Sequence, residues 1–93
     1  MSSNHETDAA YTGLVARLND DWRVVAGSCG IQWILQRRSG DQWHNKSFLR
    51  SRAGLLLYAT SYEVDAEPDA LAVLEALPER FPEARKRREE VAP

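Results

Sequence analysis

The sequence has little of the chemistry that metal centres and disulfide scaffolds require. It contains one cysteine, Cys29, and two histidines, His5 and His44, among 93 residues. A single cysteine excludes an internal disulfide and leaves no thiolate cluster for zinc. We therefore expect no metal and no other cofactor.

Long apolar runs are also missing. The longest run, Leu55–Ala59, is far shorter than the roughly 18 residues that a membrane-spanning helix needs. The polar and acidic start of the chain is the opposite of the basic and then apolar start of a signal peptide. With the single cysteine, these absences predict a cytoplasmic protein.

Motifs of catalytic sites are absent as well. The chain has no GxSxG elbow, no phosphate-binding glycine loop, and no HExxH or CxxC pair. His44 stands alone on a strand-like run, and Cys29 has no histidine near it in sequence, so both are typical of ordinary surface and turn positions. The sequence predicts no catalytic residue and no enzyme.

The hydrophobic content, 43% with three tryptophans, is sufficient for the core of one small domain. Residues 1–6 lack apolar side chains and are expected to be disordered. Residues 7–82 are expected to form a single α+β domain. Residues 83–93 form a charged C-terminal tail, for which a solvated helical extension and disorder are both open.

The first element predicted is a helix over residues 7–19. Tyr11, Leu14, Val15 and Leu18 recur at the i, i+3, i+4, i+7 spacing of one helix face. Thr7 or Asp8 is a suitable N-cap for such a helix.

Three strand-like runs follow, at residues 22–26, 31–38 and 42–49. Short turns with glycine, at residues 27–30 and 39–41, separate them. Closely spaced strands joined by short turns predict a three-stranded antiparallel β-meander.

Two C-terminal helices are predicted, at residues 52–62 and 68–77. Ser51 is a good N-cap for the first, and Pro68 is well placed in the first turn of the second. Both are expected to pack on one face of the meander. The expected core consists of Trp22, Val24, Ile31, Trp33, Leu35, Phe48, Leu55 and Leu56.

The charge is unevenly distributed although the net charge is only −2. Residues 22–52 hold six basic residues against Asp41 alone, and acidic segments flank them. Alternation along the strands places a polar set of side chains on the sheet face opposite the helices, including an exposed Trp43. The candidate binding residues are Arg23, Gln32, Gln36, Arg38, Trp43, Asn45, Lys46, Arg50 and Arg52.

These residue types suit nucleic acid. Arginine, glutamine and asparagine can form paired hydrogen bonds with base edges, and tryptophan can stack on bases. An antiparallel sheet normally leaves one face polar and solvated, however, so an ordinary solvent face is an equally weighted interpretation.

The segments WRV, QWILQRR and SFLRSRAGLL resemble, in layout, the three-stranded-sheet DNA-binding domains of tyrosine-recombinase arm-binding regions and plant ethylene-response factors. The resemblance covers about forty residues and implies that Arg23, Arg38 and Trp43 meet DNA. The order of a helix, three strands and a helix is also similar to double-stranded RNA-binding domains, without their lysine cluster. The IQWILQRR strand is similar to one in uncharacterised small proteins of bacterial, phage and plasmid genomes.

The leading hypothesis is a small non-enzymatic binding module that contacts nucleic acid through the basic sheet face. The alternative is a protein-interaction module, such as an inhibitor or regulator associated with mobile elements, in which Trp43 and the arginines act as anchors. A small enzyme subunit or ligand carrier is a third and weaker hypothesis. No membrane partner is expected, and both a monomer and a homodimer through an edge strand are open.

Overall fold

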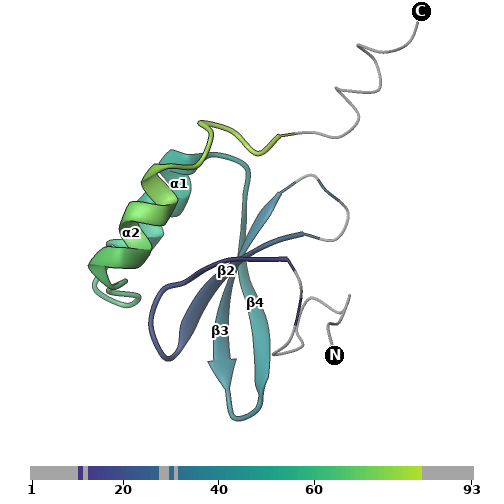
Figure 1. The fold of residues 1–93 in the computed structure, drawn as a ribbon. Helices are drawn as coiled ribbons and strands as arrows, with labels where there is room; N and C mark the ends of the chain where they lie inside the picture. Colours follow the sequence, from purple (N-terminus) through teal and green to yellow (C-terminus); the bar gives the residue numbers. More distant parts are fainter. Residues whose placement is uncertain (1–10, 12, 28–29, 31, 83–93) are drawn as a thin grey trace, which may run out of the picture.

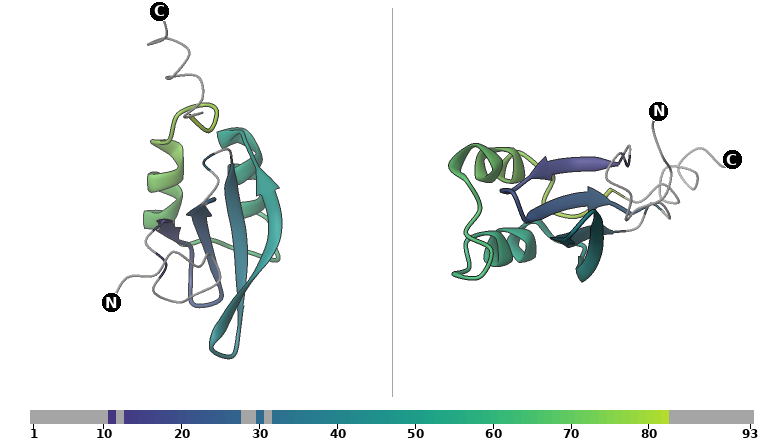
Figure 2. Two further views of the ribbon diagram at one scale, coloured as in Figure 1. Left: turned by 90° about the vertical axis from the view of Figure 1, so that its right-hand side faces the viewer. Right: turned by 90° about the horizontal axis from the view of Figure 1, so that it is seen from below.

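The computed structural model describes residues 11, 13–27, 30 and 32–82. It is an α+β fold with the strands β1 (Leu14–Arg17), β2 (Trp22–Ala26), β3 (Trp33–Ser39) and β4 (Gln42–Leu49), followed by the helices α1 (Arg52–Ala59) and α2 (Pro68–Glu75). The four strands form one antiparallel sheet in the order β1-β2-β3-β4. Both helices lie on the same side of this sheet, α2 beside β1 and α1 beside β4 (Figures 1 and 2).

The expected N-terminal helix is wrong over residues 14–17, which form β1 instead. The apolar spacing of this segment also fits a strand, because Ala16 faces Val24 in the core and Arg17 faces Arg23 on the other side. A helix of a dozen residues is marginal by itself, whereas pairing with β2 satisfies the backbone of both strands. Of the rest of the expected helix, residues 11, 13, 18 and 19 are not helical either, and residues 7–10 and 12 lie outside the described residues.

The sheet therefore has four strands and not three. The predicted runs at 22–26 and 42–49 are confirmed as β2 and β4, and β3 starts at Trp33. The added strand makes β2 internal and leaves β1 and β4 as the edges. Gly40, with a φ of 62°, is the first residue of the two-residue turn between β3 and β4. This positive φ is what a type II′ hairpin turn requires at that position.

A β-bulge in β4 changes which of its side chains face the helices. Leu35 pairs with Ser47 and Gln36 pairs with Asn45, so the pairing skips Lys46. The skipped residue reverses the alternation of the strand beyond it. Phe48 consequently shares a face with its partner Ile34, opposite the helices, and is 55% exposed. Its expected place in the core is wrong for this reason.

The core lies between the sheet and the two helices. It includes five of the residues that the sequence predicted: Trp22, Val24, Trp33, Leu35 and Leu55. Leu56 is only partly buried against this cluster, and Ile31 lies outside the described residues. The cluster also contains Ala16, Leu18, Ala59, Val64, Ala66, Ala70 and Leu74.

Both helices are shorter than expected, at eight residues each, but begin as predicted. The Ser51 side chain accepts a hydrogen bond from the backbone N–H of Gly54, which caps the start of α1. Beyond α2 the chain returns to the sheet. The N–H of Phe81 donates to the carbonyl of Arg50, and the Phe81 ring packs edge-on against Trp33, with ring centroids 5.0 Å apart.

Asn19 connects the β1–β2 turn to the loop between the helices. Its side-chain oxygen accepts from the backbone N–H groups of Asp21 and Trp22. Its amide nitrogen donates to the carbonyl of Val64 at 2.6 Å. One side chain thus fixes the turn and holds the helical layer against it.

Within the described part of the chain, neither helix has the length and apolar character needed to cross a membrane. The segments expected to be disordered or to form a charged tail, residues 1–6 and 83–93, lie outside the described residues.

Candidate nucleic-acid interface

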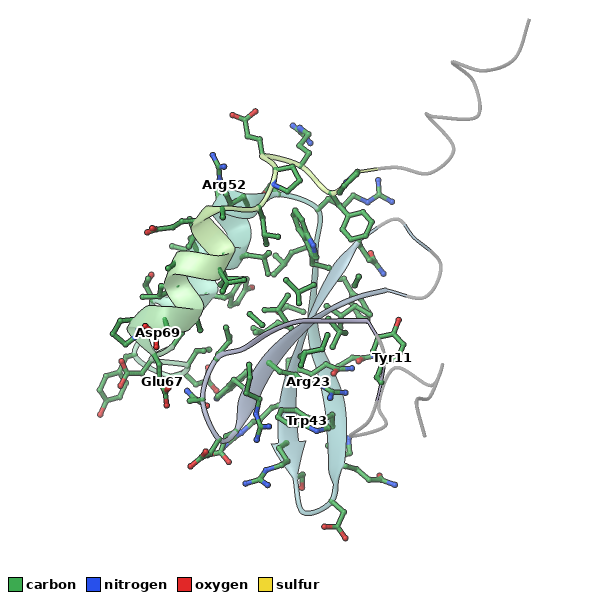
Figure 3. The ribbon with its side chains drawn as sticks, in the orientation of Figure 1. Tyr11, Arg23, Trp43, Arg52, Glu67 and Asp69 are labelled. Atoms are coloured by element: carbon green, nitrogen blue, oxygen red, sulfur yellow. The ribbon has the colours of Figure 1, made fainter. Side chains whose placement is uncertain are left out.

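Five side chains form a polar network on the sheet face opposite the helices, which we call the outer face. Cross-strand pairing aligns Arg17, Arg23, Gln36 and Asn45 in one row across all four strands, and Trp43 lies beside that row. Figure 3 shows Arg23 and Trp43 close together, away from the helices.

The network is closely connected. Arg23 Nε donates to Gln36 Oε1 at 2.6 Å, and Gln36 Nε2 donates to Asn45 Oδ1 at 2.8 Å. The guanidinium groups of Arg23 and Arg17 lie 4.5 Å and 5.0 Å from the centre of the Trp43 ring. Contacts of this kind are favourable cation–π interactions.

Most of this network is inaccessible to a partner. Arg23 is 2% exposed, Gln36 is fully buried, and Trp43 is 3% exposed. The expectation that Trp43 is an exposed anchor is therefore wrong, because the two arginines cover its ring. Asn45, at the edge strand, remains exposed.

Three other predicted binding residues lie at the opposite end of the sheet from the β3–β4 turn. Gln32 precedes β3, and its carbonyl accepts from the N–H of Gly27. Arg50 and Arg52 follow the last residue of β4. At about 3.3 Å per residue, Arg50 is on the order of 20 Å from Trp43. Arg52 Nη1 donates to the carbonyl of Leu77 at 2.8 Å and so fastens the end of α2.

The remaining predicted residues, Arg38 and Lys46, lie on the exposed β3–β4 hairpin. With three residues that the sequence did not single out, they line an open depression of about 510 Å³, called here the basic depression. Its lining residues are Arg37, Arg38, Ser39, His44 and Lys46. No carboxylate is among them, although Asp21 lies 3.8 Å from Arg38 across one border.

The depression is open because the hairpin is longer than the helices that cover the sheet. Each helix of eight residues is about 12 Å long, whereas β4, also eight residues, is about 25 Å long. The hairpin therefore extends beyond the helical layer, as Figures 1 and 2 show. Arg37 and its cross-strand partner His44 point to the helix side of the sheet but lie beyond its cover.

Sequence reasoning missed Arg37, Ser39 and His44 because alternation assigns Arg37 and His44 to the face that the helices cover. A comparison of the predicted lengths of the hairpin strands and the helices could have identified these residues. A hairpin longer than its helices leaves its tip solvated on both faces. Arg37 also makes a contact of its own, with its guanidinium 5.6 Å from the centre of the Trp22 ring.

A second open depression, of about 530 Å³, borders the first and has the opposite charge. This acidic depression is lined by Asn19, Asp20, Asp21, Trp22, Tyr62, Glu63, Val64, Asp65 and Glu67. Tyr62 is fully exposed there. The two depressions meet where Asp21 approaches Arg38 and where Arg37 lies against Trp22.

The edges of the sheet bear on self-association. The bulge at Lys46 interrupts the longer edge strand, β4, and places a lysine there. Bulges and edge lysines are devices that discourage edge-to-edge pairing. The β4 edge therefore carries two of the features by which sheets limit pairing with another chain.

Among the residues that the structure describes, no group of three or more His, Cys, Asp or Glu side chains could hold a metal ion. Comparison of the chain with protein-family models, with curated proteins and with solved structures gave no match. The resemblance in layout to sheet-type DNA-binding domains thus stays a prediction.

Proposed function

We propose that this protein is a small non-enzymatic binding module that contacts nucleic acid through the basic depression of its β3–β4 hairpin. The observation that carries this proposal is the composition of the lining. Three permanent cations, Arg37, Arg38 and Lys46, converge with a hydroxyl and an imidazole and without a carboxylate. Clustered cations of this kind neutralise phosphates, which supplies most of the affinity of non-specific nucleic-acid binding.

The proposal moves the binding surface from the outer face to the hairpin. Arg23, Gln36 and Trp43 are buried in contact with one another, and so a ligand on the outer face would have to break the network. Arg38 and Lys46 belong to both the predicted set and the basic depression. They are the two predicted binding residues that line the basic depression.

The test is the binding of fluorescein-labelled 20-mer DNA and RNA, single- and double-stranded, measured by anisotropy at 50 mM and 200 mM salt. Three neutralised phosphates give a slope of log K against log salt of about −2.7 on duplex DNA, or about 40-fold weaker binding over this range. Replacing Arg37 and Lys46 together with alanine should reduce the slope to about −0.9.

Arg50→Ala is the matched control, because it removes an exposed arginine at the far end of β4. It should leave the slope unchanged. Equal losses in the control and in the hairpin variant would place the binding elsewhere on the chain. No binding to any of the four nucleic acids at 50 mM salt would reject the proposal.

A protein partner is the second candidate, and the acidic depression is the observation that favours it. Five carboxylates and two aromatic residues, Trp22 and the fully exposed Tyr62, line one surface. Aromatic anchors within a charged rim are common in protein interfaces. Saturable binding of an arginine-rich peptide that is lost on Tyr62→Ser, without binding of nucleic acid, would favour this function.

A further inference from the structure

We infer that the basic depression recognises the phosphate backbone and not the bases, and that Asp21 limits its footprint on the side of the acidic depression. This inference rests on the proposed function and specifies its ligand. The chemistry required is a row of phosphodiester or phosphoanhydride groups, which DNA, RNA and inorganic polyphosphate share.

Amide side chains on the sheet are one means by which the protein could read a base. Paired hydrogen bonds to adenine require both atoms of a glutamine or asparagine amide. Both amide atoms of Gln36 are already engaged, with Arg23 and with Asn45, and the oxygen of Asn45 is engaged in turn. Reading adenine with either of these amides would require such a hydrogen bond to be broken.

Stacking of bases on aromatic side chains is a second way to recognise them. Recognition of single-stranded bases relies on exposed aromatic rings within the binding groove. Trp33 and Trp43 of the hairpin are 2% and 3% exposed, and Phe48 is 55% exposed but does not line the basic depression. The lining contains no Trp, Tyr or Phe, and its one ring is the imidazole of His44. Single strands and duplexes should therefore bind by the same contacts.

The arginines of the basic depression could read guanine only if both terminal nitrogens of one guanidinium group were directed at the same base. Arg37 lies against the Trp22 ring, and Arg38 lies 3.8 Å from Asp21. Directed toward the start of β2 by these contacts, the guanidinium groups present charge at the surface. Lys46 adds a point charge without a bidentate geometry.

The border between the basic and the acidic depression limits the path of the ligand. Asp21 lies 3.8 Å from Arg38, well within a Debye length, about 8 Å at physiological salt, and so acts on a phosphate placed against that arginine. The other carboxylates of the acidic depression extend the negative charge toward the helices. They repel a backbone that runs from the hairpin toward the helices. The ligand is confined to a path over the hairpin, and the cation count stays at about three, the number of permanent charges in the lining.

The experiment measures the dissociation constants of the full chain for two 20-mer duplexes, one rich in A·T and one rich in G·C, and for oligo-dT, at 50 mM salt. Linear inorganic polyphosphate serves as a competitor. We expect the three constants to agree within about threefold, since a single base-specific contact would separate them by about tenfold. Polyphosphate should displace all three DNA ligands.

Asp21→Asn should tighten binding by up to about fivefold, since the carboxylate that it removes lies 3.8 Å from Arg38 and an ion pair about 4 Å apart in water is worth that factor. Asp20→Asn, one residue further from Arg38, is the matched control and should have a smaller effect. A preference above tenfold for one DNA, failure of polyphosphate to compete, or an unchanged affinity of Asp21→Asn would overturn the inference while nucleic-acid binding itself stands. Absence of binding to every polyanion would overturn both.

Discussion

The unequal exposure of Trp43 and Phe48, two aromatic residues of β4, provides the sharpest test of the fold. Trp43 is 3% exposed on the outer face, whereas Phe48, five residues later, is 55% exposed on the same face. Simple alternation assigns these two residues to opposite faces and predicts that Phe48 is buried and Trp43 is exposed. The bulge at Lys46 moves Phe48 to the outer face, and the guanidinium groups of Arg17 and Arg23 cover Trp43 there.

Truncation to alanine should therefore have very unequal effects on stability. We expect Trp43→Ala to lower the free energy of unfolding by about 3–5 kcal/mol, the usual cost of removing a buried large aromatic side chain. The loss of two cation–π contacts, roughly 0.5–1 kcal/mol each, places it in the upper part of that range. Phe48→Ala should cost about 1 kcal/mol, because only about half of its surface is buried.

The assay is equilibrium urea unfolding followed by far-ultraviolet circular dichroism, which does not depend on tryptophan as a reporter. For a domain of this size, the loss at Trp43 corresponds to a decrease in melting temperature of at least 12 °C or so. If Trp43→Ala fails to fold, Trp43→Phe replaces it, with an expected loss of about 1–2 kcal/mol. A cost at Phe48 equal to or larger than that at Trp43 would refute the reasoning, because it would mean that β4 pairs without a bulge.

Two further predictions concern turns. Asn19→Ala removes four hydrogen bonds, including those to the carbonyls of Val64 and Asp65, and should cost about 2 kcal/mol in urea unfolding. Asn19→Asp keeps the acceptor and should recover part of the loss, and equal stability of the two variants would contradict the role of Asn19 in the turn. Gly40→Ala should cost about 1–2 kcal/mol because φ is 62° and only the backbone, with no atom within 4 Å of an added Cβ, opposes the change. Gly40→Asn tolerates this conformation better, so a thermal melt that ranks alanine above asparagine would contradict the assignment of the turn.

The strands and helices were largely predictable because their signals are local. Glycine-containing turns separated the three predicted runs, and Ser51 and Pro68 marked the helix starts that the structure has. The residues at 14–17 were not predictable in the same way, because their apolar spacing fits a helix and a strand equally well. What decides is the free edge of β2, a tertiary feature that no local pattern contains.

The bulge at Lys46 is another such feature. Nothing in the local sequence around Lys46 distinguishes a regular strand from a bulged one, and a shift of one residue moves every following side chain to the other face. The exposure of Phe48 follows directly from it, whereas the burial of Trp43 follows from the two arginines that cover its ring. The candidate site was predicted in part for the same reason: charge identified Arg38 and Lys46, but only the lengths of the packed elements identify Arg37 and His44.

The positions of the arginines separate structural from binding roles, and this affects how any binding experiment is interpreted. Arg23 is buried against Gln36 and Trp43, and so its replacement removes a hydrogen bond and a ring contact from the fold. Breaking a buried charged network of this kind is strongly destabilising. Weaker binding on Arg23→Ala would then report on unfolding, and it should disappear when affinity is measured per folded molecule. Lys46 is exposed, so Lys46→Ala should weaken binding with no change in the urea midpoint, and only that combination identifies a residue that touches the ligand.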